Sequence, residues 1–229
     1  MNKKYRSKLG KVNAHLKLLL NYEIIEDEIN DHLKRLKGFS ISENDKSEID
    51  QLAKCVSKIH SHNLNKSNLP LYGYQWVIDL VTSENCKHKT EIITALKMMS
   101  KMEYYNTGIT VKFKDKKFLT WNIDNSDWQT EYKTGHVGSY VWDIAAIINY
   151  VNDSKFSDTF LESYMRYGGN KPAIIEIYAN LYYVQVAEAV KNDNLENIMQ
   201  TTKEIIDQNI FRTELISYNT LNRLQILGY

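Results

Sequence analysis

The side chains best suited to chemistry lie between Gly108 and Tyr150. Asp124 ends a run with strand-like alternation, His136 stands in the polar segment that follows, and Asp143 belongs to a Trp-Asp-Ile-Ala-Ala run that is typical of a helix start. A loop histidine can act as a general base when a carboxylate orients its ring. The spacing around His136 offers no evident carboxylate for that purpose. These residue types alone therefore do not reveal a reaction.

Each of these residues also has a structural interpretation. Asp124, Asn125 and Asp127 are of the types that hydrogen-bond within their own turn. Asp143 has the position of an acid that caps a helix, and a lone loop histidine such as His136 is most often a surface residue. Both interpretations stay open at this point.

Two short runs with strand-like alternation precede the polar segment. Ile109, Val111 and Phe113 alternate with polar residues, which gives a strand one apolar face, and residues 118–123 form the return strand. The solvated face and the turn carry Lys112, Lys114, Lys116 and Lys117. We therefore expect one β-hairpin, then a polar loop over residues 122–138.

The rest of the chain has the apolar spacing of helices. The expected helices cover residues 1–37, 49–60, 74–80, 91–102, 141–151, 156–167, 172–190, 195–210 and 215–227. Pro172 suits the first position of its helix. Tyr178, Tyr182 and Tyr183 recur at helical spacing, which favours a place in the core over a ligand platform. The predicted fold class is α+β, mainly α, with a single hairpin.

Composition narrows the classes of partner and compartment. The chain has 229 residues with 43% hydrophobic content, enough for a substantial core, and a formal charge of +1. This balance gives no support to nucleic acid or an anionic membrane as a partner. Cys55 and Cys86 lack metal-ligand spacing and are expected to be reduced core residues. The apolar run Leu18–Leu20 is too short for a signal sequence or a membrane span, so we expect a cytoplasmic protein.

The order of several motifs resembles a known enzyme family. In chain order they are a helix ending at Ile59-His60, a strand ending at Ile123-Asp124, the run Trp142-Asp143-Ile144-Ala145, the run Phe160-Leu-Glu-Ser-Tyr, and Gly168-Gly169. This order resembles the C-terminal lobe of the aminoglycoside phosphotransferase and choline kinase family, which has a protein-kinase-like fold. The resemblance implies a helical C-lobe domain over residues 39–229 and a separate N-terminal helical segment over residues 1–38.

The resemblance also implies roles for three residues. Asp124 would match the acid that holds the Mg²⁺ of the nucleotide. Asp143 would match the buried acid that braces the catalytic loop, and His60 would match a structural residue.

Two departures from the family pattern bear on activity. The family's His-x-Asp-x-x-x-x-Asn catalytic loop is missing before the hairpin, where Glu103 and Asn106 are the nearest candidates and have the wrong spacing. No Gly-rich phosphate loop or lysine-bearing strand is found, so the N-terminal sheet lobe is largely missing. We therefore expect a degenerate, non-catalytic relative that binds a small molecule or a protein partner and needs no cofactor. The alternative is an active phosphotransferase that uses Mg-ATP on a small-molecule hydroxyl, with Asp124 as the metal-binding acid.

A lobe without its covering sheet must shield that face in another way. The apolar stripe between Leu16 and Leu36 is the segment available for the task. We expect it to pack back against the hairpin or to form a homodimer contact.

Overall fold

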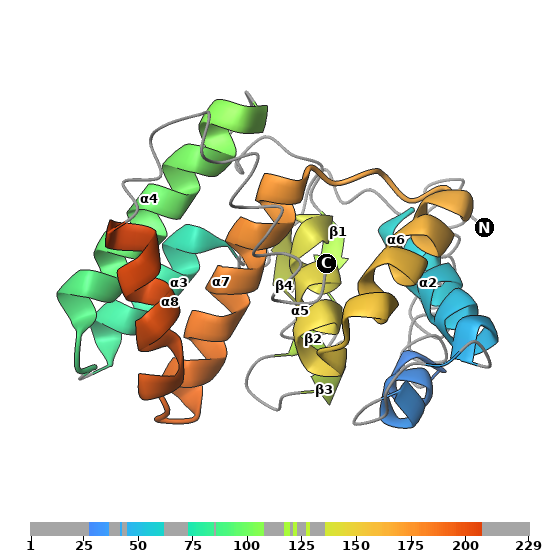
Figure 1. Cartoon of the computed structure of the whole chain (residues 1–229), viewed down its shortest axis with the longest axis horizontal. Helices are drawn as coiled ribbons and strands as arrows, with labels where there is room; N and C mark the ends of the chain where they lie inside the picture. Colours follow the sequence, from blue (N-terminus) through green and yellow to red (C-terminus); the bar gives the residue numbers. More distant parts are fainter. Residues whose placement is uncertain are drawn as a thin grey trace, which may run out of the picture.

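The computed structural model describes residues 28–36, 42, 45–61, 73–84, 86–107, 117–119, 121–122, 127–128 and 136–207. Helices dominate this part of the chain, as predicted (Figure 1). One helix covers residues 28–36. The others are α2 (Lys46–His60), α3 (Tyr74–Ser83), α4 (Lys89–Thr107), α5 (Tyr140–Val151), α6 (Ser154–Arg166), α7 (Ile174–Lys191) and α8 (Glu196–Asp207).

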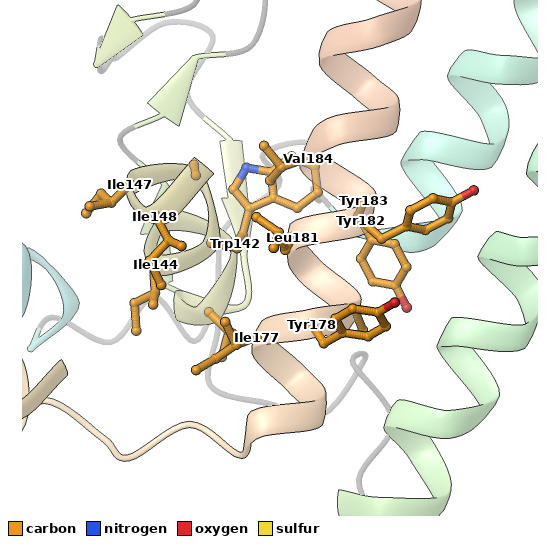
Figure 2. Packing of buried hydrophobic residues seen from close by; sticks show 14 of the residues in the cluster. Trp142, Ile144, Ile147, Ile148, Ile177, Tyr178, Leu181, Tyr182, Tyr183 and Val184 are labelled. Carbon is orange, nitrogen blue, oxygen red and sulfur yellow. The ribbon is translucent and has the colours of Figure 1, made fainter. Parts of the chain in front are cut away.

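Two central helices, α5 and α7, form the middle of the core. Nearly every residue of α5 and most residues of α7 are buried, as expected for helices that are covered on all sides. Figure 2 shows Trp142 of α5 directed toward Leu181 and Val184 of α7, while Tyr178 and Tyr183 lie on the other side of α7. The tyrosines at helical spacing are therefore core residues, as predicted.

Two groups of helices flank this pair. On one side, α3 and α4 pack on α7, and α8 packs on α4 (Figure 1). On the other side, α6 contacts α5, and α2 packs along α6. Because α2 and α6 are more than ninety residues apart, their contact joins the N-terminal part of the chain to its C-terminal half.

The ends of α5 are set by local side-chain chemistry. Ser139 precedes the helix with extended backbone, and its hydroxyl accepts a hydrogen bond from the Val141 N–H at 3.3 Å. At the other end, Asn152 takes a left-handed conformation with φ of 53°, which asparagine tolerates better than most residues. These two residues set the ends of α5, which places Asp143 in its first turn.

The predicted hairpin is not seen among the described residues. Its first strand and turn, residues 109–116, lie outside them. The return strand is extended as β1 (Lys117–Leu119) and β2 (Trp121–Asn122), but β1 pairs with β4 (His136–Gly138) and β2 with β3 (Asp127–Trp128), both antiparallel. The prediction of an unbroken loop over residues 122–138 was therefore wrong. Polar composition favours turns, yet short polar segments also complete a ladder when a strand edge lies opposite.

Two helix boundaries also differ from the prediction. α4 continues to Thr107, beyond the expected end at Met102. α7 begins at Ile174, so Pro172 precedes the helix instead of opening it. There the Ala173 N–H donates to Glu176 Oε2 at 2.8 Å, which ties up one of the N–H groups at the helix start. The helix predicted over residues 215–227 lies outside the described residues.

The N-terminal stripe is described only for residues 28–36. Ile29, Leu33 and Leu36 are buried there. The helix contacts α2, because His32 Nδ1 lies 2.6 Å from Glu48 Oε1 and Cys55 Sγ donates to Glu28 Oε2 at 3.4 Å. Residues 28–36 therefore pack on α2, whereas the first strand and turn of the hairpin, which this stripe was expected to cover, lie outside the described residues.

No helix in the described part of the chain combines the length and the apolar character that crossing a bilayer requires.

Candidate functional site

Three buried polar side chains meet where α2, α5 and α6 approach one another. His60 is in the last turn of α2, Asp143 is in the first turn of α5, and Tyr164 is near the end of α6. We call these three residues the His60 cluster. Their exposed fractions are 4%, 0% and 1%, respectively, so water does not solvate them.

The imidazole of His60 lies between the other two side chains. Its Nε2 is 3.0 Å from Asp143 Oδ2, and its Nδ1 is 2.9 Å from the Tyr164 hydroxyl. The rings of Tyr140 and Tyr164 meet the imidazole edge-on, with centroids at 6.1 and 5.7 Å. Both ring nitrogens of a buried histidine are thereby satisfied, which avoids the cost of burying an unpaired polar group.

The buried surroundings of the cluster act on the Tyr164 hydroxyl. Burial, followed by the nearby Tyr140 and Asp143, raises the pKa of Tyr164 far above its usual value. The phenol therefore keeps its proton, and its hydroxyl can donate to Nδ1 or accept from it, according to the tautomer of the imidazole. The electric field at the N-terminus of α5 also favours an acid in its first turn.

Two glycines hold Tyr164 in place. Gly168 has φ of +87°, and the Gly169 N–H bonds back to the Tyr164 carbonyl at 3.0 Å, which closes α6 with a left-handed turn. A Cβ on Gly169 would lie only 2.3 Å from the Tyr164 ring. Glycine at this position therefore leaves the space that the ring needs in order to reach His60.

The arrangement is suited to holding helices together and not to turnover. A row of tyrosine, histidine and aspartate side chains resembles a proton relay in its parts. All three groups are closed off from solvent, however, so no substrate atom reaches them in this structure. The cluster instead connects the end of α2 to the start of α5 and to α6.

The other residues singled out from the sequence are described in part. Asp124 and Asn125 lie outside the described residues. Glu103 and Asn106 belong to the last turns of α4, and His136 belongs to β4, but only their backbones are described.

The structure brings His60 and Asp143 together, and this pairing was not foreseen. Asp143 is buried, as the resemblance implies, and the His60 side chain is one of its partners. The roles that the resemblance gives to these two residues remain predictions. Tyr164 was part of the quoted pattern without an assigned role, and its place in a Tyr-x-x-x-Gly-Gly run was the available signal.

The cysteines differ in their surroundings. Cys55 is buried, and burial together with the hydrogen bond to Glu28 raises its pKa to about 12. Cys86 is half-buried, and partial burial also raises its pKa. A raised pKa keeps a thiol protonated and unreactive. Within the part of the chain that the structure describes, no three His, Cys, Asp or Glu side chains are grouped so as to hold a metal ion.

Comparison of the chain with family models, with curated proteins and with solved structures found no match.

Proposed function

We propose that this chain is a non-catalytic relative of the small-molecule phosphotransferases, which binds a small molecule or a protein partner in the cytoplasm. The family assignment rests on the order of motifs in the sequence. The His60 cluster supports it, because it places two of the motif residues, His60 and Asp143, in one buried contact.

Our proposal that the chain lacks catalytic activity rests mainly on the length of α4. The resemblance would place the His-x-Asp-x-x-x-x-Asn loop at residues 100–109, yet α4 is helical through Thr107. Residues five apart on a helix point in directions roughly 140° apart. An acid and an amide at the family spacing could not converge on one metal from this helix. Phosphoryl transfer depends on such positioning, so a continuous helix at this point opposes turnover.

The weak candidates in this helix do not restore that geometry. Glu103 and Asn106 are three residues apart and so lie on one face of α4. Their spacing differs from the family's Asp and Asn, and the longer glutamate displaces its carboxylate by a methylene group.

Binding of Mg-ATP tests the proposal. We expect isothermal titration calorimetry to give no dissociation constant tighter than about 1 mM. With a panel of small hydroxyl acceptors and radiolabelled ATP, we expect no phosphoryl transfer above the background without protein. An active small-molecule kinase assayed in parallel verifies the acceptors and the detection.

A matched pair of variants tests the alternative that the chain is an active phosphotransferase. If Mg-ATP binds in the micromolar range and phosphate is transferred, the non-catalytic proposal is wrong. Asp124→Ala should then abolish transfer, whereas Asp158→Ala, an exposed acid of α6, should leave it unchanged. That pattern would establish the active phosphotransferase with Asp124 as the metal-binding acid.

A further inference from the structure

A cavity of about 390 Å³ lies where the C-terminal ends of α5 and α7 meet the start of α8. Its volume is within the range of about 300–1,000 Å³ that is usual for small-molecule sites. The cavity is separate from the His60 cluster, because Asn149 of its lining follows Asp143 by six residues, about 9 Å along the axis of α5. An inference about this cavity does not depend on the proposed function.

Carboxamides dominate the lining of the cavity. Among the described residues, five of them face it: Asn149, Gln185, Asn192, Asn194 and Asn197. Thr201 adds a hydroxyl and Glu188 adds a carboxylate, while Ala189 and Ile198 supply apolar surface. Such a lining offers many donors and acceptors at close spacing and little net charge.

The inner groups of the lining are held in fixed orientations. Gln185 Nε2 donates to Asn149 Oδ1 at 3.1 Å, and Asn149 Nδ2 donates to Glu188 Oε2 at 2.9 Å. All three side chains are half-buried. A ligand therefore meets polar groups that are already ordered, which lowers the entropy cost of binding.

The carboxamides at the rim, Asn192 and Asn194, lie in the turn after α7, which hydrogen bonds also hold in place. After α7, Asp193 takes a left-handed conformation with φ of 51°. The Asn194 N–H bonds to the Ala189 carbonyl at 2.8 Å, and the Asp193 N–H bonds to the Val190 carbonyl at 3.3 Å. These two bonds form the closed turn that commonly ends a helix. They hold Asn192 and Asn194 at the rim of the cavity.

The lining discriminates between classes of ligand. The described residues that line the cavity include no lysine or arginine to neutralise a phosphate or carboxylate, and Glu188 would repel such anions. The same described lining residues include no aromatic ring on which a planar base could stack. Hydroxyl groups both donate and accept, so adjacent hydroxyls on a carbon ring match neighbouring carboxamides. We infer that this cavity binds a neutral polyhydroxylated small molecule of monosaccharide size.

Ligand-observed NMR and calorimetry on the full-length protein test this inference. The probes are D-glucose and myo-inositol, with D-glucose 6-phosphate as the anionic comparison and D-glucosamine as the cationic one. We expect at least one neutral probe to bind saturably in the millimolar range, as is usual for so small a ligand. We expect the phosphorylated sugar to bind several-fold more weakly.

Variants at the rim connect binding to the cavity. Asn194 and Asn197 are exposed, so the double substitution Asn194→Ala and Asn197→Ala should leave the fold intact. We expect it to weaken binding of the neutral probe about tenfold, through the loss of two hydrogen-bonding groups. Asn170→Ala, an exposed asparagine between α6 and α7, is the matched control and should have no effect.

Three outcomes would overturn the inference. One is the absence of saturable binding by both neutral probes. Another is binding that the double variant leaves unchanged, because the probe would then lie elsewhere. The third is D-glucosamine binding more than tenfold tighter than D-glucose, with the difference lost in Glu188→Gln, because the cavity would then recognise an ammonium group through its carboxylate.

Discussion

Asp143 and His60 satisfy each other's hydrogen-bonding groups in a region that water does not reach. Replacing Asp143 by Ala removes the hydrogen-bond partner of His60 Nε2 and leaves that nitrogen buried. An unsatisfied buried group costs about 1–3 kcal/mol. We expect the free energy of unfolding of Asp143→Ala, measured by urea denaturation, to fall by about this amount.

The control for Asp143→Ala is the same substitution at an acid on the surface. Asp158 is an exposed residue of α6, and Asp158→Ala should change stability by less than about 0.5 kcal/mol. Equal denaturation midpoints for Asp143→Ala and the unmodified protein would contradict the role given to the His60 cluster.

Ionisation of the Cys55 thiol makes the free energy of unfolding depend on pH in the alkaline range. Burial and then the hydrogen bond to Glu28 raise its pKa from 9.0 to about 12. Its contribution to stability is fully present below pH 9.0, where the thiol is protonated in both states. Between about pH 9 and 12 the unfolded chain releases a proton that the folded chain keeps, so this contribution is lost as pH rises. We expect the free energy of unfolding to fall across this window.

Tyrosines with raised pKa values contribute to the same fall, so the test is a difference between proteins. Cys55→Ser removes the titrating group, and its stability should decrease less steeply above pH 9 than that of the unmodified protein. Cys86→Ser, at a more exposed thiol, should change the slope less. Identical slopes for Cys55→Ser and the unmodified protein would show that Cys55 ionises alike in both states.

At the scale of elements, the helix over residues 28–36 is held to α2 by an apolar face and a polar edge. Leu33 is 1% exposed, and both His32 and Arg35 bond to Glu48 at the start of α2. Truncating a buried leucine leaves a cavity and costs about 2–5 kcal/mol. We expect Leu33→Ala to destabilise the protein by that amount in a denaturation experiment.

The neighbouring residue supplies the control for the helix. Lys34 is exposed on the same turn, and Lys34→Ala should have little effect. If the two variants have the same stability, the helix does not contribute its apolar face to the core in solution.

At the scale of the whole molecule, the helix over residues 28–36 covers part of the surface of α2. Deleting residues 1–37 removes Ile29, Leu33 and Leu36, which belong to the same buried cluster as the apolar residues of α2, and so uncovers part of that cluster. Contiguous exposed apolar surface of this kind promotes association. We expect the truncated chain to be less stable in thermal unfolding and to self-associate in analytical ultracentrifugation.

A shorter deletion separates the helix from the segment before it. Removing residues 1–27 keeps the helix over residues 28–36, so a loss of stability that only the longer deletion causes is due to this helix. A chain without residues 1–37 that stays soluble, monomeric and equally stable would refute the covering role.

The sequence by itself determined the mainly helical class and the approximate places of α2, α3, α5, α6, α7 and α8. Apolar residues recur every three or four positions in these segments, and that spacing is a local property which any helix must satisfy to bury one face. Caps such as Asp153, whose carboxylate accepts from the N–H groups of Lys155 and Phe156, act over the same short range. Local signals of this kind can be identified without knowing what the segment packs against.

The tertiary structure alone decided the contacts between distant segments. His60 meets Asp143 across 83 residues and Tyr164 across 104, and no spacing rule relates such positions. Strand β1 pairs with β4 because that edge lies opposite, although the composition of residues 122–138 favoured a loop. The amide-lined cavity likewise forms only where three helices meet. Periodicity specifies which face of an element is buried, whereas the identity of its neighbour depends on how all the buried faces fit together.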